Sequence, residues 1–509
     1  MCGFIYVQSE NIKKGQVNNA LQDISYRGPD FSQVLNPTSS LYLSHCRLSI
    51  LDIKKRSHQP LVSNNGRYAI IYNGEIYNYK YLEKRFNLKL KTTSDTEVIL
   101  EGYSKIGNKI FDYLEGMFSL VIHDYENNTW VASRDPFGIK PLYIYKKNND
   151  TIISSETKAI TSLVNVTPSI DSINEWKKFR SPLPGKSFFN EIEEILPGIV
   201  LQSNGIKSKN YQLEQKNSNF NQQELNNLLL ASVKSHTIAD VECTSLVSGG
   251  LDSSIICHLT QFENYYSIGL PDNNEFEETI ESSKILNKKI NNYEISFENL
   301  KENWINLTKL KGEPLLLPNE GLIFEICKKF INNEKVFLTG EGADELFFGY
   351  DRIFRWSIFN EFNLNEFLKQ YSYSSTESTP RFLDFIHEIK KNKNCIEFLE
   401  DFFYNFHLPV LLRRMDFSSM AASKEARVPF ITKKLVDYLY RIDHKNKIDN
   451  KNSKLPLRTF ASNNGLNFLL KRKKVGFSAL EKSENNYVTE YKKFRKIILE
   501  TLKWDEYEG

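Results

Sequence analysis

The sequence has few cysteines and places none of them in a recognisable framework. Its six cysteines are widely scattered, with no Cys-x-x-Cys pair and no neighbouring histidines at metal-ligand spacing. This pattern indicates neither a disulfide scaffold nor a zinc site. The chain also lacks a basic and apolar leader at its start, and it has no apolar run long enough to span a bilayer. We therefore expect a cytoplasmic protein with reduced thiols and no membrane partner.

Charge of one sign is not in excess either. The 66 lysines and arginines nearly balance the 63 aspartates and glutamates, so the net charge is only +3. A balance of this kind does not favour a nucleic-acid partner. Hydrophobic residues make up 40% of the chain, which is typical of a globular protein with a substantial core. A chain of 509 residues is longer than one ordinary domain, so we expect more than one.

The pattern of residues changes near position 221. Before it, short apolar segments are separated by Asn, Gly and Asp, which predicts strands. These segments are 41–50, 67–79, 116–125, 129–135 and 141–147. A helix is expected to interrupt them after Ser94, because Ser94 and Glu97 match the S-x-x-E capping signal.

After residue 221, helical segments alternate with short buried strands, which predicts a doubly wound α/β sheet. Beyond Tyr350 the sequence becomes mostly helical. A polar segment between the two patterns is typical of a linker. We accordingly divide the chain into a first domain of residues 1–212, a linker of residues 213–220 and a second domain of residues 221–509.

The sharpest motif follows the strand expected at 243–247. Two glycines there let the backbone approach a ligand, and the helix that follows presents free N–H groups to an anion. The motif lacks the lysine of the loop that serves γ-phosphoryl transfer. It resembles instead the pyrophosphate loop of ATP pyrophosphatases, although a serine-rich helix start without a ligand is the alternative. The residues it predicts to bind ATP are Ser248, Gly249, Gly250, Leu251, Asp252, Ser253 and Ser254.

A second loop, residues 337–350, presents acidic side chains after another apolar strand. Oxygen ligands suit Mg²⁺, so Asp252 and Asp344 are candidates to hold the metal on the phosphates of ATP. Helix capping by Asp344 is the alternative interpretation.

The chain begins Met-Cys, and removal of Met1 would leave Cys2 with a free α-amine beside its thiol. An α-amine has a pKa of about 8, so it can act as a general base for the thiol. Alone this signal is weak. Asn73 and Gly74 strengthen it, because a side-chain amide and a backbone N–H can together stabilise an oxyanion. The alternative for Asn73-Gly74 is an ordinary hairpin turn.

Taken together, these motifs resemble the glutamine-hydrolysing asparagine synthetase family over nearly the whole chain. The stretches 26–30, 45–51, 134–143, 154–160 and 425–431 carry the resemblance further. It implies an α+β N-terminal nucleophile hydrolase sandwich of αββα layers, the class II glutamine amidotransferase domain. An α/β doubly wound pyrophosphate-loop domain with a helical C-terminal part would follow it.

The resemblance also implies roles for residues of the first domain. Cys2 would attack the side-chain amide of glutamine, with Asn73 and Gly74 as the oxyanion hole. Arg47 would bind the α-carboxylate of glutamine, and Glu75 and Asp95 would hold its α-ammonium. The backbone of Leu48, Ser49, Ile50 and Leu51 would line the pocket.

In the second domain, ATP would contact four residues besides the loop: Val247, Ile268, Thr339 and Gly340. Glu341 would serve adenylate formation or take the proton of ammonia, and Lys454 would neutralise charge on the phosphate. Glutamine, ATP with Mg²⁺ and a carboxylate are thus the implied ligands, and an internal ammonia channel between the two sites is implied as well. A homodimer is left open.

The chain departs from the family pattern at Phe348 and Thr432, and in the segment 312–325. Phe348 replaces a usual glycine close to the expected nucleotide or acceptor. The leading hypothesis is therefore aspartate amidation, with a different small carboxylate such as a sugar acid as the alternative. A binding protein that has lost catalysis and a tRNA-modifying enzyme are disfavoured by the complete set of motifs and the near-neutral charge.

Overall fold

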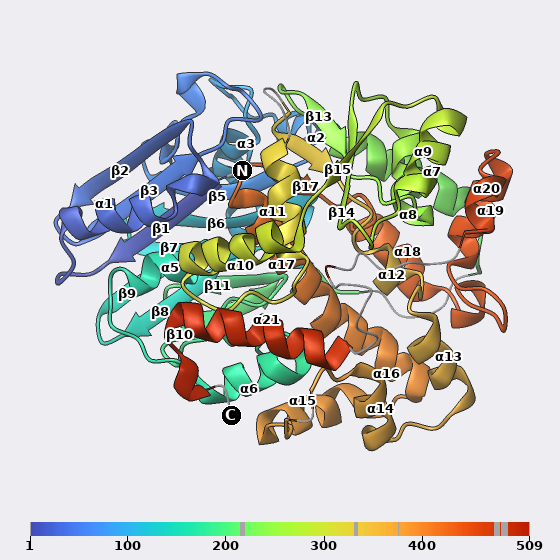
Figure 1. The fold of residues 1–509 in the computed structure, drawn as a ribbon. Helices are drawn as coiled ribbons and strands as arrows, with labels where there is room; N and C mark the ends of the chain where they lie inside the picture. Colours follow the sequence, from blue (N-terminus) through green and yellow to red (C-terminus); the bar gives the residue numbers. More distant parts are fainter. Residues whose placement is uncertain are drawn as a thin grey trace.

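The computed structural model describes residues 2–213, 219–329, 334–374, 376–472, 479 and 487–507 (Figure 1). In its first half two sheets lie face to face. Within the described residues each sheet has six strands, and neighbouring strands run antiparallel. One sheet has the order β10 (Ile192–Glu194), β8 (Tyr143–Lys147), β9 (Asp150–Ser154), β1 (Cys2–Gln8), β3 (Leu41–Arg47), β2 (Phe31–Thr38). The other has the order β12 (Lys207–Lys209), β11 (Ile199–Gln202), β7 (Thr129–Arg134), β6 (Gly116–Asp124), β5 (Tyr68–Ile76), β4 (Leu61–Val62).

Alternation along β1 explains why this half has four layers. Phe4 and Tyr6 point between the sheets, whereas Ile5 and Val7 point to the outer helices. Side chains on a strand alternate between its two faces, so one strand can supply two cores. The helices of this half are α1 (Lys14–Asp23), α2 (Tyr79–Arg85), α3 (Asp95–Ile106), α4 (Ile110–Tyr113), α5 (Thr157–Thr161) and α6 (Ile170–Phe179).

Helices α1 and α5 pack on the sheet that contains β1, and α2, α3 and α4 pack on the sheet that contains β5. The expected αββα sandwich is therefore confirmed. Helix α3 begins after Ser94 as predicted, and the Ser94 side chain accepts the Glu97 N–H at 3.4 Å. The Glu97 carboxylate completes no capping box, because it accepts the N–H groups of Lys91 and Thr92 instead.

The second half is built on a parallel sheet. Its strands are β13 (Cys243–Ser245), β14 (Tyr265–Gly269), β15 (Ile290–Glu294), β16 (Val336–Leu338) and β17 (Glu425–Arg427). Strands β13, β16 and β17 pair in that order, β14 pairs with β15, and a bridge from Leu246 to Tyr266 joins the two groups. Val336 and Leu338 face one core while Phe337 faces another, so helices cover both faces, as the predicted doubly wound fold requires.

The helices around this sheet divide between its faces. Helices α7 (Gln222–His236), α8 (Leu251–Leu259) and α19 (Leu455–Asn463) contribute to the core at Val336, and α11 (Glu320–Lys329) contributes to the core at Phe337. The remaining helices of this half are α9 (Phe276–Leu286), α10 (Phe297–Lys311), α12 (Ala343–Leu346), α13 (Asp351–Phe359), α14 (Leu364–Tyr371), α15 (Pro380–Lys390), α16 (Cys395–Phe402), α17 (Leu408–Met420), α18 (Lys433–Arg441), α20 (Asn467–Leu470) and α21 (Tyr487–Leu502).

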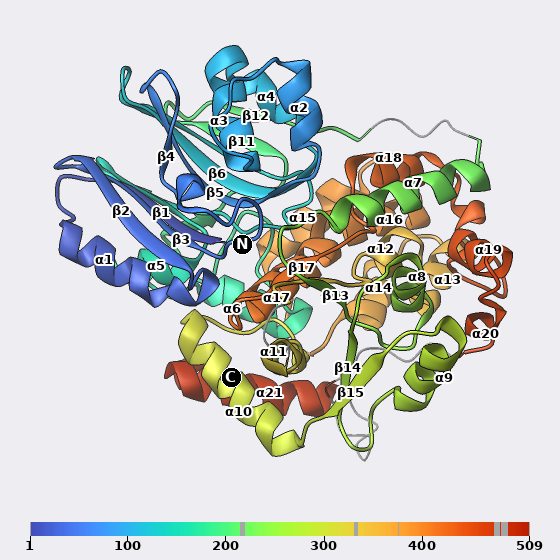
Figure 2. The ribbon, with the colours of Figure 1, turned by 90° about the horizontal axis from the view of Figure 1, so that it is seen from above.

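The two halves lie side by side, with β17 and α17 between them (Figure 2). Most of the expected linker, residues 214–218, lies outside the described residues. Among the described helices, none combines the length and the apolar character that a bilayer crossing requires.

Candidate active sites

Cys2 opens β1 and lies opposite Arg47 in the register with β3. It is buried, and its backbone N–H donates to Asn73 Oδ1 at 3.1 Å. Burial raises the pKa of the Cys2 thiol, against the opposing effects of the Leu48 backbone and the Arg47 charge. A thiol in this setting stays protonated until a base removes its proton.

Asn73 and Gly74 lie inside β5 and not in a hairpin turn, because β5 continues without a break from Tyr68 to Ile76 beside β6. Asn73 is completely buried, yet its Nδ2 has no hydrogen-bond partner among the described residues. A Cβ at Gly74 would lie 2.2 Å from the carbonyl oxygen of Met117, so only glycine fits. The Asn73 amide thus offers a buried donor beside Cys2, as an oxyanion hole requires.

Arg47 organises the loop that follows β3. Its Nη2 donates to the carbonyl oxygens of Leu51 at 3.0 Å and Asp52 at 2.7 Å, and its Nη1 donates to that of Lys54 at 3.1 Å. These bonds wrap the loop around the guanidinium. The other loop residues predicted to bind glutamine, Leu48, Ser49, Ile50 and Leu51, are all buried beside it.

Two buried carboxylates complete this group. Asp95, at the start of α3, accepts the Tyr72 hydroxyl at 2.6 Å and the Ile76 N–H at 2.9 Å. Burial raises the pKa of Asp95 and of Glu75, and the charge of Asp95 adds to the effect on Glu75. Asp95 and Glu75 are both buried and their charges interact, so together they favour the binding of a cation.

The second group surrounds a cavity of about 550 Å³ at the carboxyl ends of β13, β14 and β16. This edge of a parallel sheet is where ligands bind in doubly wound folds, and the volume suits a cofactor-sized ligand. The predicted ATP residues that line it are Val247, Ser248, Gly250, Leu251, Asp252, Ser253, Ile268, Thr339 and Gly340.

Two predicted ATP residues, Gly249 and Ser254, do not line the cavity. Ser254 is completely buried, and its N–H is used inside α8 by a bond to the Gly250 carbonyl. Gly249 has φ +79° and lies against Glu278, and its carbonyl oxygen accepts a bond from Arg472. Gly249 therefore shapes the loop from the side that faces Glu278 and not the cavity.

Lys454 joins the two aspartates expected to hold a metal. Its Nζ lies 2.6 Å from Asp344 Oδ1 and is also bonded to Asp252. These charges raise the pKa of Lys454, although its burial acts in the opposite direction. The two carboxylates therefore converge on one cationic position, which fits a divalent ion shared with phosphate oxygens. In the described ranges, no group of three or more His, Cys, Asp or Glu side chains is arranged to hold a metal alone.

Glu341 is paired with Arg414 of α17, and Arg414 Nη1 also donates to Asn319 Oδ1 at 3.2 Å. Burial raises the pKa of Glu341, while Arg414 opposes this effect. Sequence reasoning missed Arg414 and Glu275, and Glu275 lines the cavity, as Arg472 also does. Neither Arg414 nor Glu275 belongs to a local motif, so only their positions in the fold bring them to the site. Asn319 lies in the segment 312–325, where the chain departs from the family pattern.

Comparison with known families identifies the family of the chain. The family model described as "Glutamine amidotransferase domain" matches residues 1–212, and the one described as "Asparagine synthase" matches residues 224–507. The chain belongs to the asparagine synthase family. It is therefore a ligase of the ATP-dependent, glutamine-hydrolysing class.

Similar proteins fit this family. Asparagine synthetase [glutamine-hydrolyzing] 3 of Bacillus subtilis (strain 168) is 27% identical over 522 residues, which cover 90% of this chain and 84% of the relative. Asparagine synthetase B [glutamine-hydrolyzing] of Escherichia coli (strain K12) is 33% identical over 243 residues, covering 46% of this chain and 40% of the relative. A solved glutamine phosphoribosylpyrophosphate amidotransferase of B. subtilis has 15% identity and a TM-score of 0.33, with 57% of this chain and 65% of that chain covered. This last similarity is too low to indicate function.

Two departures from the family pattern have a structural explanation away from the cavity. The Phe348 ring is completely buried and stacks on Phe354, with ring centroids 4.2 Å apart, and it does not line the cavity. Thr432 caps α18, and its hydroxyl accepts the Leu435 N–H at 3.4 Å. Threonine can replace aspartate in that role.

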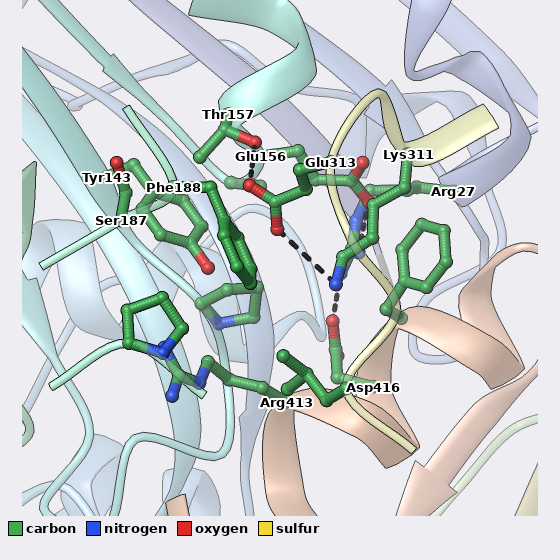
Figure 3. A pocket seen from close by; sticks show the side chains of 15 residues that line it. Arg27, Tyr143, Glu156, Thr157, Ser187, Phe188, Lys311, Glu313, Arg413 and Asp416 are labelled. Carbon is green, nitrogen blue, oxygen red and sulfur yellow. Dashed lines mark hydrogen bonds and ion pairs between the residues drawn. The ribbon is translucent and has the colours of Figure 1, made fainter. Parts of the chain in front are cut away.

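In this asparagine synthase family member a further cavity lies between the two halves (Figure 3). Its volume is about 40 Å³, enough for a molecule the size of water. Arg27, Tyr143 and Glu156 reach it from the first half, and Lys311, Glu313, Arg413 and Asp416 reach it from the second.

Proposed function

We propose that the protein is a glutamine-dependent asparagine synthetase. The observation that carries the proposal is the buried Asn73 amide, whose Nδ2 has no partner among the described residues and which lies beside Cys2. A strand interior gives no structural reason for an unpaired amide donor, whereas a developing oxyanion does. Two relatives that align with 90% and 94% of this chain are named glutamine-hydrolysing asparagine synthetases, and these names support asparagine as the product.

In the first reaction the Cys2 sulfur attacks the side-chain amide carbon of glutamine. The α-amine left by removal of Met1 takes the thiol proton and passes it to the leaving nitrogen, so ammonia departs and a glutamyl thioester remains. Asn73 Nδ2 and the Gly74 N–H bind the oxyanion. Arg47 holds the α-carboxylate, Glu75 and Asp95 hold the α-ammonium, and water then releases glutamate.

In the second reaction a carboxylate oxygen of aspartate attacks the α-phosphorus of ATP, and pyrophosphate leaves. Ser248, Gly250 and Ser253 bind the pyrophosphate, and Lys454 neutralises charge that develops on it. Asp252 and Asp344 would hold a Mg²⁺ ion, which supplies further neutralisation of the phosphates when bound. Ammonia from the first site then attacks the acyl carbon, Glu341 accepts its proton, and AMP departs. We propose that ammonia passes through the cavity between the halves, because its lining residue Arg27 donates to the Cys2 carbonyl.

The decisive experiment measures pyrophosphate release with ATP, Mg²⁺ and glutamine, with and without aspartate. We expect release to depend on aspartate and asparagine to form in equal amount. Glutamine hydrolysis without aspartate-dependent pyrophosphate would contradict aspartate as the acceptor while leaving the amidotransferase reaction intact.

Cys2→Ala tests the assignment of the two sites. We expect it to abolish use of glutamine and to preserve synthesis from added ammonia, because adenylation takes place in the other half. Loss of both activities in a folded variant would contradict the assignment. Mass spectrometry of the intact protein should also show that Met1 is absent, since otherwise the α-amine belongs to the wrong residue.

A further inference from the structure

Arg427 lies on β17 in the second half, yet its side chain enters the glutamine site of the first half. It is completely buried, and its Nη2 lies 3.2 Å from Glu75 Oε2. The other oxygen of this carboxylate, Glu75 Oε1, is buried and has no partner within the described part of the chain. One oxygen of Glu75 is therefore held by a permanent cation, and the other is left for something else.

The rest of the Arg427 guanidinium is fixed from several directions. Its Nε donates to Glu425 Oε1 at 2.6 Å, and its Nη1 donates to the carbonyl oxygens of His236 at 2.9 Å and Ile238 at 2.6 Å. A guanidinium held by three neighbours has little freedom to rotate. It can therefore define the orientation of the Glu75 carboxylate.

The same turn after α7 also holds the loop that covers the glutamine site. Asp240 N–H donates to the Ile50 carbonyl at 3.0 Å, and Asp240 Oδ2 accepts the Asp52 N–H at 2.8 Å. The backbone of Arg427 reaches the other site, because its carbonyl oxygen accepts the Thr339 N–H at 3.0 Å. The second half therefore supplies part of the proposed glutamine site from a strand that is hydrogen-bonded to Thr339, a residue that lines the ATP cavity.

We infer that Arg427 is a positioning residue for glutamine: it holds one oxygen of Glu75 so that the other faces the α-ammonium group of the substrate. The inference rests on the proposed glutaminase function. Burial and the nearby charges of Asp95 and Glu425 raise the pKa of Glu75, and Arg427 opposes them. Without Arg427, Glu75 would be more easily neutralised and free to turn away, and the α-ammonium would lose its partner.

The test is Arg427→Met in the full-length protein, assayed for release of glutamate from glutamine. We expect KM for glutamine to rise by roughly tenfold or more, because a hydrogen bond to a charged group is lost, with a smaller effect on kcat. The monoamide of glutaric acid lacks the α-ammonium, so its Ki as a competitive inhibitor should stay at the wild-type value. Arg427→Lys keeps a positive charge and should recover part of the affinity for glutamine.

Arg381→Met is the matched control. Arg381 also joins the halves, through a 2.6 Å bond to the buried Glu175, but it contacts neither site. We expect its KM for glutamine to match the wild type. If Arg427→Met does not fold, as judged by loss of synthesis from ammonia, Arg427→Lys carries the test with a smaller rise in KM.

A wild-type KM in a folded Arg427 variant would overturn the inference. An equal rise in KM for glutamine and in Ki for the monoamide would also overturn it, since that result means general damage to the pocket. Absence of glutamine hydrolysis in the unaltered protein would instead refute the proposed function and this inference with it.

Discussion

Asn73 carries the clearest chemical signature in the molecule at the scale of a single residue. A buried donor without a partner costs about 1–3 kcal/mol of folding free energy, so a stable fold keeps one where a ligand will satisfy it. Its Oδ1 accepts the Cys2 N–H, which fixes the amide and aims its Nδ2 away from that bond. This geometry supports the role that we propose for Asn73 in the reaction, since it gives the amide no role in the packing of β5.

Asn73→Ala should therefore lower kcat for glutamine hydrolysis by about 10²–10³-fold, the usual cost of removing one oxyanion donor. KM for glutamine should change little, because the donor acts mainly after the thiol attacks. Steady-state measurement of glutamate release checks this, with synthesis from added ammonia as the internal control. A variant that loses affinity and keeps kcat would show that Asn73 binds the ground state instead.

Glu275 gives a prediction about pH. It lines the ATP cavity, and burial together with the charge of Glu278 raises its pKa to about 8. Because the pKa is raised, Glu275 is neutral below about pH 8 and becomes a carboxylate above it. A carboxylate there repels phosphate, so KM for ATP should rise above that pH.

Glu275→Gln should remove this rise, since the amide does not ionise. KM for ATP, measured between about pH 7 and pH 9.5 for both proteins, is the readout, and the wild type and the variant should agree at the lower end. If KM for ATP changes with pH in the same way in the wild type and in Glu275→Gln, another group causes the pH dependence.

At the scale of an element, the turn between β13 and α8 depends on two glycines that differ in their constraints. Gly249 has φ +79°, and an added Cβ would lie 2.7 Å from Glu278 Cβ. Gly250 has φ −71° and ψ 170°, which any residue adopts, and its added Cβ would meet only Ser248 Oγ at 3.4 Å. The first glycine is therefore required by the backbone, whereas the second is not.

Gly249→Ala should destabilise the second half by about 1–2 kcal/mol from backbone strain alone, with the contact to Glu278 adding to it. Gly250→Ala should leave the unfolding temperature near that of the wild type. Thermal unfolding of the two variants side by side checks the difference. Equal stability would mean that the turn relaxes in a way that the structure does not show.

The sequence predicted elements well where the signal was local. The helix after Ser94 and the glycine turn at Ser248 form where their patterns indicated, whereas the strand expected over 67–79 covers Tyr68–Ile76 and Tyr79 already begins α2. Asn73-Gly74 shows the limit, because this pair favours a hairpin in isolation but lies inside β5, where pairing with β6 decides the conformation. Arg414 left no local signal, since only the fold of the second half brings it to Glu341. Arg427 lies in the stretch 425–431, but that pattern does not indicate its contact with Glu75, which forms only when the halves pack together.

At the scale of the whole molecule, α17 connects the two sites. Asp416 reaches back to the first half, with Oδ2 at 2.8 Å from Arg27 Nη2 and Oδ1 at 3.1 Å from Lys140 Nζ. Arg27 Nε in turn donates to the Cys2 carbonyl at 3.0 Å. Two residues before Asp416, Arg414 holds Glu341 in the other site. A single helix therefore contacts, through Arg27, the proposed nucleophile of one reaction and, through Arg414, the proposed proton acceptor of the other.

The ion pairs of Asp416 are also part of the stability of the assembled halves. Although burial acts to raise the pKa of Asp416, the charges of Arg27 and Lys140 lower it, so the carboxylate is ionised at neutral pH. The stability that it contributes is present above the ordinary pKa of an aspartate. It is lost only as the pH falls through the lowered value.

Asp416→Asn would leave the buried cations Arg27 and Lys140 without their carboxylate partner, which should lower the free energy of unfolding by about 3–5 kcal/mol. Because Arg27 also holds Cys2, we expect the two reactions to become uncoupled, so that more glutamate than pyrophosphate is released. Glu400→Gln is the matched control, because Glu400 pairs with the buried Lys447 at 2.5 Å entirely within the second half. Glu400→Gln should lose a comparable amount of stability and should still release glutamate and pyrophosphate in equal amounts. If both variants release the products equally, the contacts of α17 hold the halves together without linking their reactions.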